Sequence, residues 1–147
     1  MRIAVAADHG GFDLKEQLLP YLRELGHEVT DFGTFSKESV DYPEFAFAAC
    51  EPVARGEYDR AILVCGTGIG IGISANKVKG IRCAVCSEPV SARLTRAHND
   101  ANAIAMGGRI VGIELAKGIV SAFLDTPFEG GSHQRRIDKI TDYELRT

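Results

Sequence analysis

Short apolar runs alternate with amphipathic segments along the whole chain. Runs of strand length are found at 3–7, 27–32, 59–64, 81–86 and 103–106. Between them apolar residues recur at helical spacing, as at Leu14, Leu18 and Leu22, which share one face of a helix that Gly26 ends. This pattern predicts helices over about 14–25, 43–55, 72–78, 87–98, 112–124 and 132–145.

Strands that alternate with helices favour a parallel sheet, because parallel neighbours need crossover connections. We therefore expect an α/β fold with three layers, in which helices cover both faces of a doubly wound sheet of five parallel strands, Rossmann-like or flavodoxin-like. The length of 147 residues fits a single domain, 1–147. Pro20 and Pro52 lie inside two of the expected helices and should bend or shorten them.

The residues that follow the strands include most of the chemically capable side chains. In sheets of this type ligands bind at the carboxyl ends of the strands. The strand ends here are Asp8-His9, Cys65-Gly66-Thr67, Cys86-Ser87 and Gly107-Gly108-Arg109. We expect these residues to share one rim of the sheet.

Composition and charge exclude several classes of partner. Hydrophobic residues make up 45% of the chain, charged residues 25%, and the net charge is −3. This balance predicts no nucleic-acid partner, which would call for a basic face. The apolar runs are too short to span a membrane, and a strand pattern starts at the N-terminus, so we expect a cytoplasmic protein. Four scattered cysteines agree with that compartment.

One motif stands out. Residues 65–72 read Cys-Gly-Thr-Gly-Ile-Gly-Ile-Gly directly after a buried-strand pattern. Glycines at every second position let the backbone approach a ligand and direct N–H groups toward an anion. Three common uses are excluded, since the motif lacks the Lys-Ser/Thr pair of a P-loop, the spacing of a dinucleotide fingerprint, and the arginine of a C-x5-R phosphatase at Ile71.

The cysteines have both chemical and structural interpretations. Cys65 opens the glycine motif next to an expected helix N-terminus, which would favour its thiolate, although a free cysteine is often a small core residue. Cys83 and Cys86 form a C-x-x-C, but residues three apart in a strand point to opposite faces, so we expect no metal there. Cys50 lies on a helix beside alanines and is expected in the core.

Taken together, the motifs resemble type B ribose-5-phosphate isomerases over nearly the whole chain. The resemblance rests on Asp8-His9-Gly10-Gly11, Asp41-Tyr42-Pro43, Cys65-Gly66-Thr67-Gly68-Ile69-Gly70, Ala75-Asn76-Lys77, Ile81-Arg82, Ser87-Glu88-Pro89, His98-Asn99-Asp100 and Gly107-Gly108-Arg109. Galactose-6-phosphate isomerase subunits share much of this pattern and are the nearest alternative.

The resemblance implies an intramolecular oxidoreductase that needs no metal or other cofactor and interconverts ribose 5-phosphate and ribulose 5-phosphate through a cis-enediolate. It makes Cys65 the base for proton transfer and gives Thr67 and His98 the ring opening. The backbone of Gly66, Gly68, Ile69 and Gly70 would hold the intermediate. Asp8, Tyr42 and Asn99 would contact sugar hydroxyls. Some relatives use a glutamate after the glycine motif, but this chain has Ser74 and Ala75 there.

By the same resemblance, the phosphate would bind His9, Arg109, His133 and Arg136. The family often takes some of these residues from a neighbouring subunit, so we expect a homodimer, or a tetramer, with shared active sites. Gly130-Gly131 would let the last helix extend to that partner. Many relatives have arginine where this chain has Ser132. Either Arg135 or the Ser132 hydroxyl takes over the phosphate contact of that arginine, or this chain binds the phosphate more weakly.

Alternatives remain at this point. His98 could be an ordinary histidine at a helix C-terminus, where the helix dipole favours it. The substrate could be galactose 6-phosphate or allose 6-phosphate instead of a pentose phosphate. A non-catalytic phosphate-binding module could also carry such a glycine motif.

Overall fold

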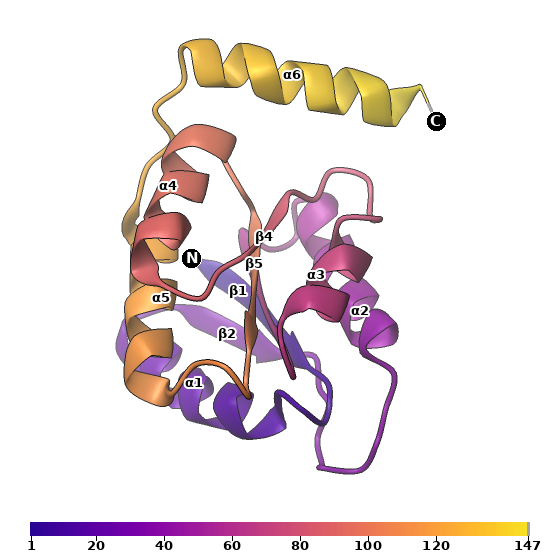
Figure 1. The fold of residues 1–147 in the computed structure, drawn as a ribbon, viewed down its shortest axis with the longest axis vertical. Helices are drawn as coiled ribbons and strands as arrows, with labels where there is room; N and C mark the ends of the chain where they lie inside the picture. Colours follow the sequence, from indigo (N-terminus) through magenta and orange to yellow (C-terminus); the bar gives the residue numbers. More distant parts are fainter. Residues whose placement is uncertain (147) are drawn as a thin grey trace.

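The computed structural model describes residues 1–146 and contains one parallel sheet (Figure 1). Its strands are β1 (Arg2–Ala7), β2 (Glu28–Asp31), β3 (Arg60–Cys65), β4 (Cys83–Val85) and β5 (Ala103–Gly107). The helices are α1 (Phe12–Glu24), α2 (Tyr42–Ala54), α3 (Ile69–Ala75), α4 (Pro89–Asn99), α5 (Ile113–Asp125) and α6 (Ser132–Leu145).

Both faces of the sheet are covered by helices, which confirms the three-layer α/β prediction. Helices α1, α4 and α5 lie on one face and α2 and α3 on the other (Figure 1). Alternate residues of β1 enter the two separate cores, Ile3 and Val5 on one side and Ala4 and Ala6 on the other. Such two-sided burial explains why the strands are continuous apolar runs.

The strand order is β2-β1-β3-β5-β4, and all four pairings are parallel. A flavodoxin has the order 2-1-3-4-5, so the last two strands are exchanged here. From β1 the chain continues to β2 on one side, whereas β3 and the later strands lie on the other side of β1, so the strand order reverses between β1 and β3. Ligands in open α/β sheets bind at such a point. The carboxyl ends of β1 and β3 are therefore where a site is expected.

The exchange makes β4 an edge strand of only three residues, shorter than the predicted 81–86. The Asn76 side chain covers this edge. Its Nδ2 donates to the Cys83 carbonyl at 2.8 Å, and its Oδ1 accepts from the Cys83 N–H at 2.8 Å. The amide thus takes the place of a neighbouring strand and blocks pairing with another chain at this residue.

Two local predictions are wrong, and one of the two effects expected of the internal prolines, shortening of the helices, does not occur. The helix expected from about Gly72 begins at Ile69, because the motif's own side chains accept the first free N–H groups of the helix. Glu88 rather than Ser87 is the N-cap of α4, and its carboxylate accepts the Ser91 N–H, which lowers the pKa of Glu88. Helices α1 and α2 continue past their internal prolines, so neither is shortened there.

The last helix matches its predicted range and contacts α4 at one end of the molecule (Figure 1). Ile137 is the buried residue of α6, whereas Ile140, Tyr143 and Leu145 are at least 55% exposed. Within residues 1–146 no helix combines the length and hydrophobicity needed to cross a bilayer.

Candidate active site

The buried Cys65 lies where β3 ends and turns into α3. Its side chain is 4% exposed, and its Sγ accepts the N–H of Gly68 at 3.2 Å. Two residues further on, Thr67 Oγ1 accepts the N–H of Ile69 at 3.2 Å. The thiol and the hydroxyl therefore face the start of the same helix, and their positions are fixed by the backbone.

The loop after β5 is bound directly to this turn. The Gly108 N–H donates to the Cys65 carbonyl at 2.8 Å, and the Arg109 N–H donates to the Gly66 carbonyl at 3.0 Å. A Cβ placed on Gly66 would lie 3.4 Å from Arg109 Nη1, so the guanidinium packs against this glycine. Arg109 thereby brings a positive charge to the carboxyl end of β3.

Two glycines of the motif have packing roles that the sequence did not reveal. Gly68 has a φ of +82°, and a Cβ there would lie 2.7 Å from the Met106 carbonyl carbon. Gly70 lies inside α3, where a Cβ would lie 2.6 Å from Tyr42 Cζ. Gly70 therefore leaves room for the Tyr42 ring. This packing role comes in addition to the ligand contact that the resemblance implies for the Gly70 backbone.

Side chains that follow β1 complete this end of the sheet. Asp8 is 6% exposed, and its Oδ1 accepts the N–H groups of Gly10 and Gly11, which leaves Oδ2 to accept from a ligand. His9 Nδ1 accepts the Val40 N–H at 3.2 Å, so a neutral His9 carries its proton on Nε2.

A cavity of about 530 Å³ lies beside these side chains. It is lined by Asp8, His9 and the segment 39–44, which includes Tyr42. Ligand pockets for small molecules have volumes of about 300–1,000 Å³. We call Asp8, His9, Tyr42, Cys65, Gly66, Thr67, Gly68, Ile69, Gly70 and Arg109 the rim group, and the structure brings them together as predicted.

Four predicted site residues lie elsewhere. His98 and Asn99 end α4, just before β5 begins, and His133 and Arg136 lie in the first half of α6. Since β5 starts there, this is the amino end of the sheet. We call His98, Asn99, His133 and Arg136 the far group. The six residues of β3 put the two ends about 17 Å apart. His98, to which the resemblance gives the ring opening together with Thr67, therefore lies at the opposite end of the sheet from Thr67 of its own chain.

The far group has its own connections. The His98 and His133 rings stack with centroids 4.3 Å apart and an interplanar angle of 13°. Glu129 Oε1 lies 3.6 Å from His133 Nε2 and 3.9 Å from His98 Nε2. Sequence analysis did not select Glu129, and its only signal was a position just before Gly130-Gly131.

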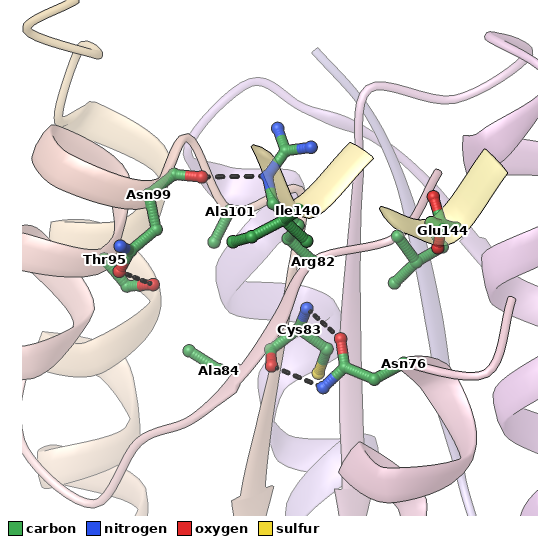
Figure 2. A pocket seen from close by; sticks show the side chains of 10 residues that line it. Asn76, Arg82, Cys83, Ala84, Thr95, Asn99, Ala101, Ile140 and Glu144 are labelled. Carbon is green, nitrogen blue, oxygen red and sulfur yellow. Dashed lines mark hydrogen bonds between the residues drawn. The ribbon is translucent and has the colours of Figure 1, made fainter. Parts of the chain in front are cut away.

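A second cavity, of about 400 Å³, opens between α6 and the edge strand β4 (Figure 2). Among the predicted site residues, Asn99 contributes to its lining. The Asn99 side chain is held by the Thr95 hydroxyl, which donates to Oδ1 at 3.1 Å, and the Asn99 carbonyl accepts from Arg82 Nε at 2.9 Å. The first bond lies within α4 and orients the Asn99 amide, and the second fixes the end of α4 against the residue that precedes β4.

The other three cysteines differ from Cys65 in their surroundings. Burial raises the pKa of the Cys50 thiol to about 12 and that of Cys86 to about 11, and it also raises the pKa of Cys83. Cys83 packs into one core and Cys86 into the other, as expected for opposite faces. These thiols stay protonated at neutral pH and are core residues.

A buried thiol, a hydroxyl and an arginine lie at the carboxyl ends of adjacent strands, and a ligand-sized cavity opens at Asp8, His9 and Tyr42 of the same rim. This arrangement is typical of an α/β enzyme whose site lies at the reversal point of the sheet.

Comparisons with known proteins agree with an α/β enzyme and identify its family. The family model described as Ribose/Galactose Isomerase matches residues 3–140. Ribose-5-phosphate isomerase B of Escherichia coli is 54% identical over 145 residues, which cover 99% of this chain and 97% of that protein. The solved structure of Clostridium thermocellum ribose-5-phosphate isomerase B has a TM-score of 0.98 at 50% identity and covers 99% of each chain.

A relative with a different substrate in its name also matches. Galactose-6-phosphate isomerase subunit LacB of Clostridium acetobutylicum is 42% identical over 142 residues, which cover 97% of this chain and 82% of that protein. The chain belongs to the ribose/galactose isomerase family, and it is an isomerase. The predicted resemblance is confirmed.

Proposed function

We propose that this isomerase interconverts ribose 5-phosphate and ribulose 5-phosphate through a cis-enediolate. The observation that carries the proposal is the position of Cys65, a buried thiol at the carboxyl end of β3 whose Sγ receives an N–H bond, in a chain 54% identical to a ribose-5-phosphate isomerase B.

In the proposed reaction, Thr67 and His98 first open the furanose by moving a proton from the O1 hydroxyl to the ring oxygen. The Cys65 thiolate then removes the proton on C2, and the electron pair forms the C1–C2 double bond of an enediolate. The resulting thiol returns the proton to C1. A proton moves from O2 to O1, so the aldehyde becomes an alcohol and the C2 hydroxyl becomes a ketone.

Backbone amides would hold the charged oxygen of the intermediate. The N–H groups of Gly68 and Ile69 already donate to Cys65 and Thr67. Helical amides of the first turn have no acceptor within the helix, so Gly70 supplies the next donor, and Gly66 and Thr67 precede it in the turn. Asp8 Oδ2, Tyr42 and Asn99 would bind sugar hydroxyls.

The phosphate would be held by His9, Arg109, His133 and Arg136. Since the rim group and the far group lie at opposite ends of one sheet, a single chain cannot present both to one substrate. We propose that a second copy supplies the far group. A two-fold axis perpendicular to the strands reverses their direction, and so places the carboxyl end of one sheet beside the amino end of the other.

Exposed apolar residues next to the rim support such a homodimer. Ile69 and Ile73 on α3 and Val85 on the edge strand are 54%, 58% and 48% exposed. Val85 packs beside Gly72 of α3, so β4 and α3 meet there. A second subunit would remove these side chains from water.

The substrate is tested with chelator-treated enzyme by measuring kcat/KM for ribose 5-phosphate, allose 6-phosphate and galactose 6-phosphate. The highest value is expected for ribose 5-phosphate. A higher value for either hexose phosphate would assign the chain to that substrate, the alternative that the LacB relative supports. No turnover of any of the three would contradict the proposal.

A further inference from the structure

Three metal-ligating side chains converge at the amino end of the sheet. His98 comes from the last turn of α4, Glu129 from the segment before α6, and His133 from the first turn of α6. Each offers one ligand atom, and these atoms all lie within 4.8 Å of one another.

The distances are close to those of a tetrahedral metal site. Zinc bonds of about 2.0–2.1 Å put neighbouring ligand atoms about 3.3 Å apart. Glu129 Oε1 lies 3.6 Å from His133 Nε2 and 3.9 Å from His98 Nε2. The three side chains are 25% to 59% exposed, so their small closing movements meet little packing resistance.

The backbone already holds the cluster together. The Glu129 N–H donates to the carbonyl of Ala97 at 3.0 Å, which fixes Glu129 beside His98. The His133 N–H donates to the Gly130 carbonyl at 3.2 Å, which fixes the first turn of α6 after Gly130. The stacked imidazole rings have to turn out of their parallel arrangement before both Nε2 lone pairs can meet one ion. The backbone of the three residues already lies in place, which favours affinity.

We propose that His98, Glu129 and His133 form a Zn²⁺ site and that zinc inhibits the isomerase. Two imidazoles and one carboxylate are a ligand set that zinc takes in proteins, with water in the fourth position. Coordination occupies the Nε2 lone pair of His98, which can then no longer accept or deliver the proton of ring opening. Zinc binding itself is independent of the proposed function, whereas the inhibition rests on it.

The binding test is a calorimetric titration of chelator-stripped protein with zinc chloride. Glu129→Gln removes the carboxylate charge, and Glu114→Gln is the matched control, since Glu114 is an exposed carboxylate on α5 that pairs with Lys117 at 3.7 Å. All proteins carry Cys65→Ala, so that this thiol cannot bind the ion. We expect one ion per chain and an affinity about 10- to 100-fold weaker for Glu129→Gln alone. Equal affinity in Glu129→Gln, or no binding in the Cys65→Ala background, would overturn the site.

The activity test uses proteins with Cys65 present. Stripped Glu129→Gln is expected to isomerise at nearly the parent rate, yet to keep its activity at zinc concentrations that inhibit the parent and the Glu114→Gln control. Zinc binding without inhibition would overturn the inhibitory role. If stripped parent protein turned over no sugar phosphate, the proposed function would fail, while the calorimetry would still decide the metal site.

Discussion

The rim group and the far group are built in different ways. Backbone hydrogen bonds hold the rim group, as between Gly108 and the Cys65 carbonyl and between Gly68 and the Cys65 sulfur, and its central thiol is 4% exposed. The far group stands on helix ends, where the His98 side chain is 41% exposed and that of His133 is 25% exposed.

This difference shows which half of the site is preformed. Buried groups bonded to the backbone of a sheet keep their geometry without ligand, whereas exposed side chains at helix ends gain theirs from a covering surface. In the proposed reaction, the Cys65 thiol that removes the carbon-bound proton belongs to the first kind. The groups proposed to bind the phosphate and to open the ring belong to the second kind and would come from a second subunit.

Removing the thiol should have the largest effect. Cys65→Ala is expected to lower kcat for ribose 5-phosphate by about 10²- to 10⁴-fold, because the proton-transfer base is lost, while KM stays nearly constant. Steady-state kinetics measures both. Cys50→Ala, in the core, is the control and should keep kcat close to the parent value. A kcat for Cys65→Ala near that of the parent would remove Cys65 as the base.

The second prediction tests whether the two groups come from different chains. Cys65→Ala and Arg136→Ala chains, each nearly inactive, are mixed under conditions that exchange subunits. A heterodimer then holds one site with an intact rim group and an intact far group. Random exchange should restore about one quarter of the parent activity. Demonstrated heterodimers without recovery would show that sites are not shared.

The third prediction separates the chemical roles of the two groups. His98→Asn should lower kcat/KM for the cyclic sugar by about 10²-fold, because ring opening loses its acid/base group, and should affect an open-chain analogue far less. The ratio of the two kcat/KM values reports the role. Equal losses on both substrates would rule out ring opening as the role of His98.

The smallest expected effect concerns the packing of the rim. Gly70→Ala places a methyl group against the Tyr42 ring and should destabilise the fold by about 1–3 kcal/mol. Gly112→Ala is the control, since a Cβ at Gly112 has no neighbour within 4 Å, and should change stability by less than about 0.5 kcal/mol. Urea denaturation measures both. Equal stabilities would mean that the Tyr42 ring moves freely.

Much of the fold could be predicted because it follows from local patterns of apolar and polar residues. Two-sided burial makes each strand a continuous apolar run, and the crossover rule then gives a parallel sheet. The start of α3 was missed because glycine usually indicates a loop, whereas here Cys65 and Thr67 accept N–H groups at the start of the helix. The position of β4 was also beyond the sequence, because strand order depends on which edges pack together.

One buried charge also could not be predicted from the sequence, because it depends on tertiary packing. Lys15 lies on the expected first helix and has the spacing of a surface residue, yet its side chain is fully buried. Its Nζ lies 2.7 Å from Asp31 Oδ2, across the edge strand β2. Glu16 Oε1, from the next residue along the chain, lies 2.9 Å from the same Nζ. A buried ammonium needs such partners, and the packing of α1 against β2 adds the Asp31 carboxylate, which the sequence did not indicate.

The sequence by itself determined the α/β class, because apolar periodicity and the crossover rule depend on neighbours in the chain. The rule that parallel strands end at one edge predicted that Asp8, Cys65 and Arg109 lie together, and the resemblance of the motifs gave the family and the other residues of the rim group. The predicted topology also sends the end of α4, with His98 and Asn99, to the amino end of the sheet, because a helix that connects parallel strands runs antiparallel to them, so these residues cannot reach Cys65 of the same chain. Only the tertiary structure decided that Glu129 and His133 meet His98 there and that β4 lies at the edge of the sheet, because both depend on which surfaces pack together.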